Sequence, residues 1–104
     1  MATLIKNGTL ITASETYKAD ILIENEKIAQ IGENLSHPNA DVVDATGLYI
    51  LPGGVDAHVH LDLPSMGTVS SDNYETGTAA AIFGGTTTVI DFAIQEKGKT
   101  CTYI

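Results

Sequence analysis

The segment from Val55 to His60 carries the residues of this chain best suited to chemistry. Asp56, His58 and His60 alternate there with small apolar residues, and side chains of a β-strand alternate between its faces, so the polar three are predicted to share one side. The Cα atoms of His58 and His60 would lie roughly 6.6 Å apart, which lets each imidazole place a nitrogen ~2.0–2.1 Å from one zinc ion. An incidental polar patch has the same spacing, and spacing alone leaves both interpretations open.

The histidine segment is expected to open a strand–helix–strand unit. A loop follows from about Asp62 to Ser71, and Asp62 would share the face of the histidines if the strand continued that far. Residues 86–92 are rich in β-branched side chains and predict a second, buried strand. Two strands joined through a helix are parallel with a right-handed crossover, and such strands collect catalytic groups at their carboxyl ends.

A helix is predicted between these two strands. Asp72 suits the N-cap position, and Glu75 three residues later completes a capping box. Gly84-Gly85 marks the end of the helix. The expected packing stripe consists of residues at helical spacing, namely Tyr74, Gly77, Thr78, Ala81 and Ile82.

Residues 1–52 show short strand patterns separated by turn signals, which predict an all-β half such as part of a sandwich. Asn7-Gly8 is either the turn of a hairpin or a bulge within one bent strand. Asn25-Glu26 separates two apolar segments, 20–23 and 27–31, and predicts a hairpin. Further short strands are expected at 42–43 and 48–51, and Pro52-Gly53-Gly54 marks the change to the second half.

Charge and composition exclude several classes of protein. The 104 residues include 13 acidic and 5 basic side chains, and the net charge of −8 argues against binding to nucleic acid or to a membrane surface. No apolar stretch approaches the ~18–20 residues of a membrane span, and the start has no secretory signal pattern. The single cysteine, Cys101, excludes an intrachain disulfide. The chain is therefore expected in the cytoplasm.

Other polar residues have simpler interpretations. His37 lies in a polar segment and is expected on the surface, not at a metal. Cys101 lies in a tail to which no structure is assigned and is expected to have no chemical role. Asp91 is expected to accept a hydrogen bond at the end of its strand.

Four segments together resemble the amidohydrolase superfamily. Residues 4–9, 52–60 and 84–92 are similar to the opening, the histidine motif and the second barrel strand of that superfamily. Residues 61–68 resemble its cyclic-amidase branch, which contains dihydropyrimidinase and D-hydantoinase. The resemblance extends to about Ile94.

The resemblance implies a mixed fold: part of a β-sandwich, followed by the first βαβ unit of a TIM-like (β/α)8 barrel that is incomplete in this chain. Residues 1–52 would be the partial sandwich, 53–94 the barrel unit, and 95–104 a divergent or disordered tail. It also implies two metal ions, usually zinc, of which His58 and His60 hold one. A bridging carboxylated lysine, two further histidines and a catalytic aspartate belong to later strands, so no catalytic residue beyond the two ligands is expected here.

The loop after the histidines indicates the substrate class. Relatives that act on dihydroorotate carry an arginine at the position of Asp62, where it grips a carboxylate. An aspartate there would repel an anion, so neutral cyclic diamides such as dihydropyrimidines or 5-substituted hydantoins are favoured. The substrate-pocket loop is expected to comprise Asp62, Leu63, Pro64, Ser65 and Met66.

The resemblance implies opening of a ring C–N bond by metal-activated water, but the chain alone is expected to be inactive, because a catalytic zinc normally takes three protein ligands. The alternative is a truncated, non-enzymatic protein, or a module that interacts or assembles with a separate remainder. Two barrel strands leave their outer edges unpaired, so association through open edges or as a homo-oligomer is expected.

Overall fold

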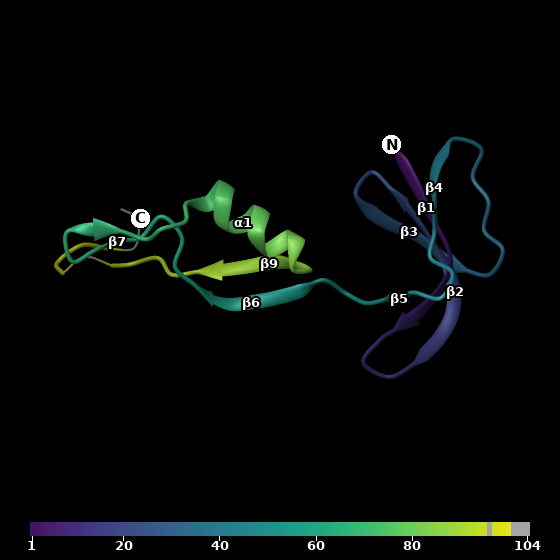
Figure 1. The fold of residues 1–104 in the computed structure, drawn as a ribbon, viewed down its shortest axis with the longest axis horizontal. Helices are drawn as coiled ribbons and strands as arrows, with labels where there is room; N and C mark the ends of the chain where they lie inside the picture. Colours follow the sequence, from purple (N-terminus) through teal and green to yellow (C-terminus); the bar gives the residue numbers. More distant parts are fainter. Residues whose placement is uncertain (96, 101–104) are drawn as a thin grey trace. The chain divides into compact units, whose positions relative to one another are not determined.

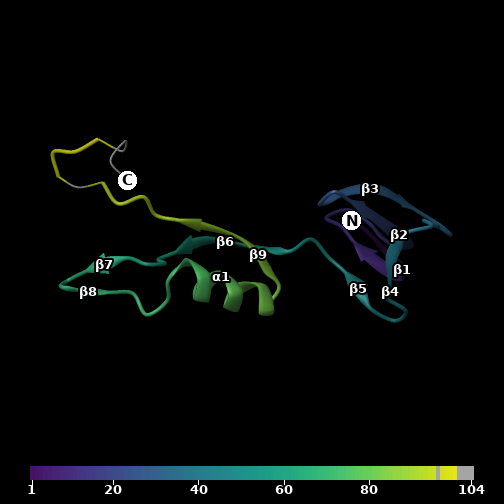
Figure 2. The same cartoon turned by 90° about the horizontal axis from the view of Figure 1, so that it is seen from above.

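The computed structural model describes residues 1–95 and 97–100. Cys101 and the end of the tail lie outside the described residues, so the structure does not test the predictions made for them above. The described chain consists mostly of β-strands with one helix, and it divides into two compact units, Met1–Pro52 and Gly53–Ile104 (Figures 1 and 2). Within the described part, no helix is long and apolar enough to cross a membrane.

The first unit is built on one five-stranded sheet with the order β3-β2-β1-β4, and β5 pairs with the far part of β1. β1 is antiparallel to β2, and β2 to β3, whereas β4 and β5 run parallel to β1. The strands are β1 (Ala2–Ile11), β2 (Thr16–Glu24), β3 (Lys27–Gly32), β4 (Ala40–Asp44) and β5 (Tyr49–Ile50).

The structure decides between the two interpretations of Asn7-Gly8. β1 runs unbroken through this pair, and its register with β2 shifts between Ile5 and Gly8, so the pair is a bulge within one strand. Asn7 has φ 62°, in the left-handed region. A Cβ on Gly8 would lie 2.2 Å from Cδ1 of Ile50, so only glycine lets β5 approach here.

The hairpin predicted around Asn25-Glu26 is confirmed as β2–β3. Both turn residues have positive φ, 50° for Asn25 and 63° for Glu26. Such turns match the right-handed twist of the flanking strands, which is why the chain accepts a glutamate in this region.

The buried core lies in the first unit. Leu10, Ala19 and Ile21 form its central cluster, against which Ile5, Ile23 and Ile50 pack as partly buried neighbours. The buried apolar residues are Leu4, Leu10, Ala19, Ile21, Leu22 and Ala45.

One carboxylate is buried beside this core. Asp20 is 5% exposed, and it accepts hydrogen bonds from the N–H of Asn7 at 2.8 Å and of Leu35 at 3.0 Å. Lys6 Nζ lies 3.2 Å from the same carboxylate. The Asn7 bond, above all, lowers the pKa of Asp20; burial acts in the opposite direction, and Lys6 and the Leu35 bond reinforce the lowering. Asp20 therefore fixes the bulge of β1 to the loop after β3.

The second unit contains the predicted strand–helix–strand arrangement. β6 (Gly54–Val59) and β9 (Thr86–Asp91) form a parallel pair, and α1 (Tyr74–Phe83) joins them and lies along one face of the pair (Figures 1 and 2). The segment predicted as a plain loop contains a small hairpin, β7 (Pro64–Ser65) and β8 (Thr68–Val69).

The predicted cap of this helix is wrong by one residue. Asn73 is the N-cap: its side chain accepts from the N–H of Thr76 at 2.9 Å, and the Thr76 hydroxyl accepts from the Asn73 N–H at 3.2 Å. Asp72 instead accepts from the Thr76 hydroxyl at 3.0 Å. Asparagine and aspartate are equally good N-cap residues, so the sequence alone did not determine whether Asp72 or Asn73 caps the helix. The predicted end is confirmed by Gly85, whose φ is 85°.

The expectation that residues 86–92 form a buried strand is wrong. No described residue after Pro52 is buried, and Val55, Ile82 and Ile90 remain 62%, 65% and 53% exposed. The predicted helical stripe is covered only in part, because Tyr74 is also exposed. The physical reason is that β9 is covered within the described chain by one strand at one edge and one helix on one face.

Candidate functional site

Three rings meet where the parallel strands end. His58 lies in β6 and His60 just beyond it, and their ring centres are 5.1 Å apart with the planes at 87°. The ring of Phe92, which directly follows β9, lies 4.6 Å from that of His58 and 5.0 Å from that of His60. The structure thus brings the two imidazoles to one place, on one side of the strand.

This separation fits two imidazoles on a single metal ion. With zinc ~2.0–2.1 Å from a nitrogen of each ring in tetrahedral geometry, the ring centres would be about 5 Å apart. Both histidines are exposed, so an ion has access to them. Among the described residues, no group of three or more His, Cys, Asp or Glu side chains gathers as a metal site. The described part therefore offers two imidazoles as candidate ligands.

Asp91 ties the elements around the histidines together. It pairs in register with Val59, and its carboxylate accepts from the N–H of Leu61 at 3.1 Å and of Phe92 at 2.6 Å. This confirms the predicted strand-end hydrogen bond. Desolvation raises the pKa of Asp91, but these bonds and the one from Tyr74 outweigh it and leave that pKa lowered. The same contact raises the pKa of the Tyr74 hydroxyl.

Asp62 does not continue the strand alternation. β6 ends at Val59, and Asp62 has φ 51° and donates its N–H to the carbonyl of Asp72 at 2.8 Å. Asp62 was expected to share the face of the histidines only if the strand continued as far as Asp62, and the strand does not. A tight turn carries it away from the strand and toward the start of α1.

Phe92, whose ring contacts both histidines, also lines a pocket of about 390 Å³, whereas neither histidine lines it. Of the five loop residues predicted to shape a pocket, Asp62, Leu63 and Pro64 line it. Met66 does not, because it is fully exposed at the turn of the β7–β8 hairpin, where its φ is 49°. Ser65 pairs with Thr68 in the same hairpin. The remaining lining residues are Leu61, Tyr74, Phe92 and Ile94.

Phe92 and Tyr74 are the site residues that sequence reasoning did not single out. A usable signal was present, because Phe92 is the last residue of the predicted second strand. The carboxyl ends of neighbouring parallel strands lie at one edge of a sheet.

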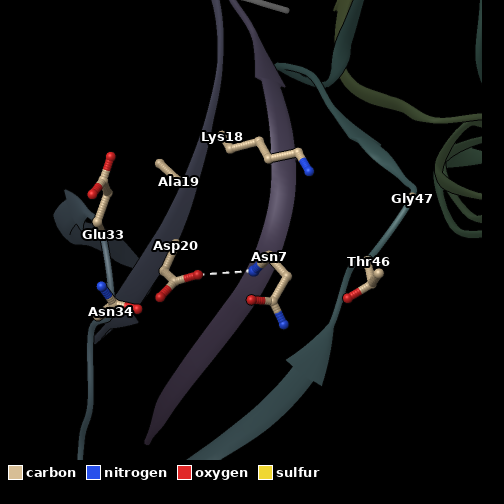
Figure 3. Close-up of a pocket in the computed structure, with 8 residues that line it drawn as sticks. All are labelled: Asn7, Lys18, Ala19, Asp20, Glu33, Asn34, Thr46 and Gly47. Atoms are coloured by element: carbon tan, nitrogen blue, oxygen red, sulfur yellow. Dashed lines mark hydrogen bonds between the residues drawn. The ribbon is translucent and has the colours of Figure 1, made fainter.

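The first unit holds a larger, polar pocket of about 550 Å³ around Asp20, Asn7 and Thr46 (Figure 3). Its buried carboxylate is already satisfied by two backbone N–H groups and by Lys6, so it is part of the fold. His37, predicted on the surface, is half-buried, and its Nε2 lies 3.3 Å from a Glu24 oxygen. It is far along the chain from the other histidines and belongs to the first unit, whereas they belong to the second.

Comparison with known proteins identifies the family. The model of the amidohydrolase family matches residues 49–100, which include both histidines. The chain belongs to the amidohydrolase family. A D-hydantoinase of Geobacillus stearothermophilus is 58% identical over 99 residues, covering 95% of this chain and 21% of that protein. A dihydropyrimidinase of Dictyostelium discoideum is 48% identical over 98 residues, covering 93% of this chain and 20% of that protein.

Solved amidohydrolase structures give the same result. A D-hydantoinase crystal structure superimposes with a TM-score of 0.91 at 56% identity, over 95% of this chain and 22% of that one. The dihydropyrimidinase of Brevibacillus agri NCHU1002 gives 0.90 at 56% identity, over 96% and 22%. The chain spans about a fifth of the length of these relatives and matches their N-terminal part. The resemblance to the dihydropyrimidinase and D-hydantoinase branch is thereby confirmed.

Proposed function

We propose that this chain is the N-terminal part of a metal-dependent hydrolase that opens the ring C–N bond of dihydropyrimidines or 5-substituted hydantoins. The observation that carries the proposal is the pair of imidazoles 5.1 Å apart, in a chain 58% identical to a D-hydantoinase. In this proposal residues 1–52 are part of a β-sandwich, 53–94 begin a (β/α)8 barrel and 95–104 form a divergent tail. The single cysteine favours a reducing, cytoplasmic setting.

The role of this chain's own residues in that reaction is to bind and orient. His58 and His60 would hold one metal ion, with zinc as the expected metal because neutral imidazoles suit it. A bound zinc polarises a carbonyl and lowers the pKa of water. The two rings fix where that chemistry would take place, at the carboxyl end of β6 beside the pocket.

The pocket favours a neutral substrate ring. Asp62 places a carboxylate at its lining, which repels an anionic ring, while Leu63 and Pro64 offer apolar surface to an exocyclic group. Ser65 and Met66 lie outside the lining, so we assign the contact with substrate to the first three loop residues.

Zinc binding tests the proposal. We expect the chain to bind zinc weakly, and His58→Ala or His60→Ala to lower the affinity by about tenfold or more, because each removes a ligand from a two-ligand site. His37→Ala, the third histidine of the chain, is the matched control and is expected to bind as the unaltered chain does. The measurement is competition with a chromophoric chelator. Equal affinity for all four proteins contradicts the proposal.

We also propose that the open edges of β6 and β9 associate with a second copy of the chain. Each strand pairs on one side in the described structure, and both strands carry exposed apolar side chains such as Val55 in β6 and Ile90 in β9. Sedimentation is expected to show concentration-dependent association that Ile90→Lys weakens. Met66→Lys, at a fully exposed hairpin turn, is the control. A monomer at every concentration would rule this association out.

A further inference from the structure

The end of β9 contacts the histidine pair through two adjacent residues. The Asp91 carboxylate accepts the N–H of Leu61, the residue directly after His60, at 3.1 Å. The Phe92 ring lies within 4.6 Å of the His58 ring and 5.0 Å of the His60 ring, centre to centre. One residue therefore holds the backbone of the pair, and its neighbour contacts both rings.

We propose that Asp91 and Phe92 are positioning residues that hold His58 and His60 in the arrangement for sharing one metal ion before the ion binds. This inference rests on the proposed role of the two histidines as ligands. It adds two residues of the neighbouring strand, neither of them a ligand, that set the geometry of the pair.

Asp91 is placed to fix the backbone at a point where the sheet no longer does so. β6 ends at Val59, so strand pairing does not hold the chain at His60 and Leu61. The Asp91 carboxylate replaces that pairing, and it also accepts the Phe92 N–H. Hydrogen bonds to a carboxylate are directional and stronger than neutral ones. The close packing of Leu61 against Gly77, where a Cβ would lie 2.4 Å from Leu61 Cδ2, adds a second restraint.

Phe92 is placed to restrict the imidazoles themselves. Exposed side chains ordinarily exchange between staggered rotamers, and both histidines are exposed. The Phe92 ring lies at the separation at which aromatic rings attract, and it contacts the two imidazoles together. A ligand pair already held in one rotamer each loses less entropy when the ion binds, which raises the affinity.

The role of Phe92 is tested by two measurements, the side-chain rotamers of the two histidines and the affinity of the chain for zinc. In the metal-free chain, the χ1 coupling constants of His58 and His60 measured by NMR are expected to report one rotamer each, and Phe92→Leu is expected to average them. The same change is expected to weaken zinc binding about tenfold, as loss of a group that orients ligands does. Phe92→Tyr keeps the ring and is expected to restore both readouts. Phe83→Leu alters the only other phenylalanine, which is 94% exposed at the end of α1, and is the control.

The test of Asp91 uses the amide that it holds. Asp91→Ala is expected to speed hydrogen exchange of the Leu61 amide and to weaken zinc binding about tenfold. Asp91→Asn retains one acceptor oxygen. Its Leu61 exchange rate and its zinc affinity are therefore expected to lie between those of the unaltered chain and those of Asp91→Ala. Asp72→Ala removes a carboxylate bonded to Thr76 at the helix start, and it is expected to change neither readout.

The outcomes separate this inference from the proposed function. Averaged χ1 couplings in the unaltered chain, or unaltered zinc affinity in both Phe92→Leu and Asp91→Ala, would overturn the positioning role even where His58→Ala lowers the zinc affinity as expected. Unaltered zinc affinity in His58→Ala overturns the ligand role itself, and the positioning inference with it.

Discussion

Mixed with zinc and with hydantoin or dihydrouracil, the 104-residue chain is expected to form no ring-opened product above the rate in buffer. A catalytic zinc takes three protein ligands, and the described residues gather two imidazoles and no larger cluster of ligand-type side chains. Enzymes typically accelerate their reactions by about 10⁶-fold or more. Ring opening at even a small fraction of an enzyme's rate would therefore exceed the rate in buffer and be detected. The measurement is chromatographic detection of the ring-opened product over several days.

The D-hydantoinase of Geobacillus stearothermophilus, assayed in parallel, shows that the conditions permit ring opening. The decisive contrary result is turnover by the chain that requires metal, stops on addition of a chelator and is lost in His58→Ala. That result would place a working site within these residues.

Replacing Asp20 by alanine is expected to cause the largest loss of stability in the first unit, about 2–4 kcal/mol. The change leaves the N–H groups of Asn7 and Leu35 without their acceptor. It also removes the anion that pairs with the half-buried Lys6, whose Nζ keeps only its bond to the Leu35 carbonyl at 2.8 Å. Urea unfolding followed by circular dichroism measures the loss. Asp44→Ala is the matched control, because Asp44 is exposed and also accepts a bond from Asn7, through its side chain at 3.2 Å.

The contribution of Asp20 to stability is also expected to depend on pH. The Asn7 bond and Lys6 lower the pKa of Asp20 in the folded chain, so the folded state holds the charged form more strongly than the unfolded state does. The stability it contributes is complete above the unfolded pKa of about 3.9 and is lost as the pH falls through the lower folded pKa. The stabilities of the unaltered chain and Asp20→Asn should therefore converge in strong acid. A constant difference from pH 7 downward would show that the charge of Asp20 does not contribute to the stability.

The strand–helix–strand order, the β2–β3 hairpin and the shared side of the two histidines were predictable from the sequence. Each depends on a local rule: alternation along a strand places His58 and His60 together, and Gly85 ends a helix in the left-handed region. The family was equally accessible, since the histidine motif and the strand ending in Asp91 lie within the matched residues.

The tertiary structure alone decided features that depend on partners distant in sequence. Asn7-Gly8 fits a turn or a bulge equally well, and Asp20 and Ile50 select the bulge because one accepts the Asn7 N–H and the other leaves no room for a side chain at Gly8. The place of Phe92 against both imidazoles follows from the register of β9 on β6, including its irregularities. The periodicity of a single strand carries no information about its register against another. Local patterns therefore determined which residues face together, whereas contacts between strands determined what holds them there.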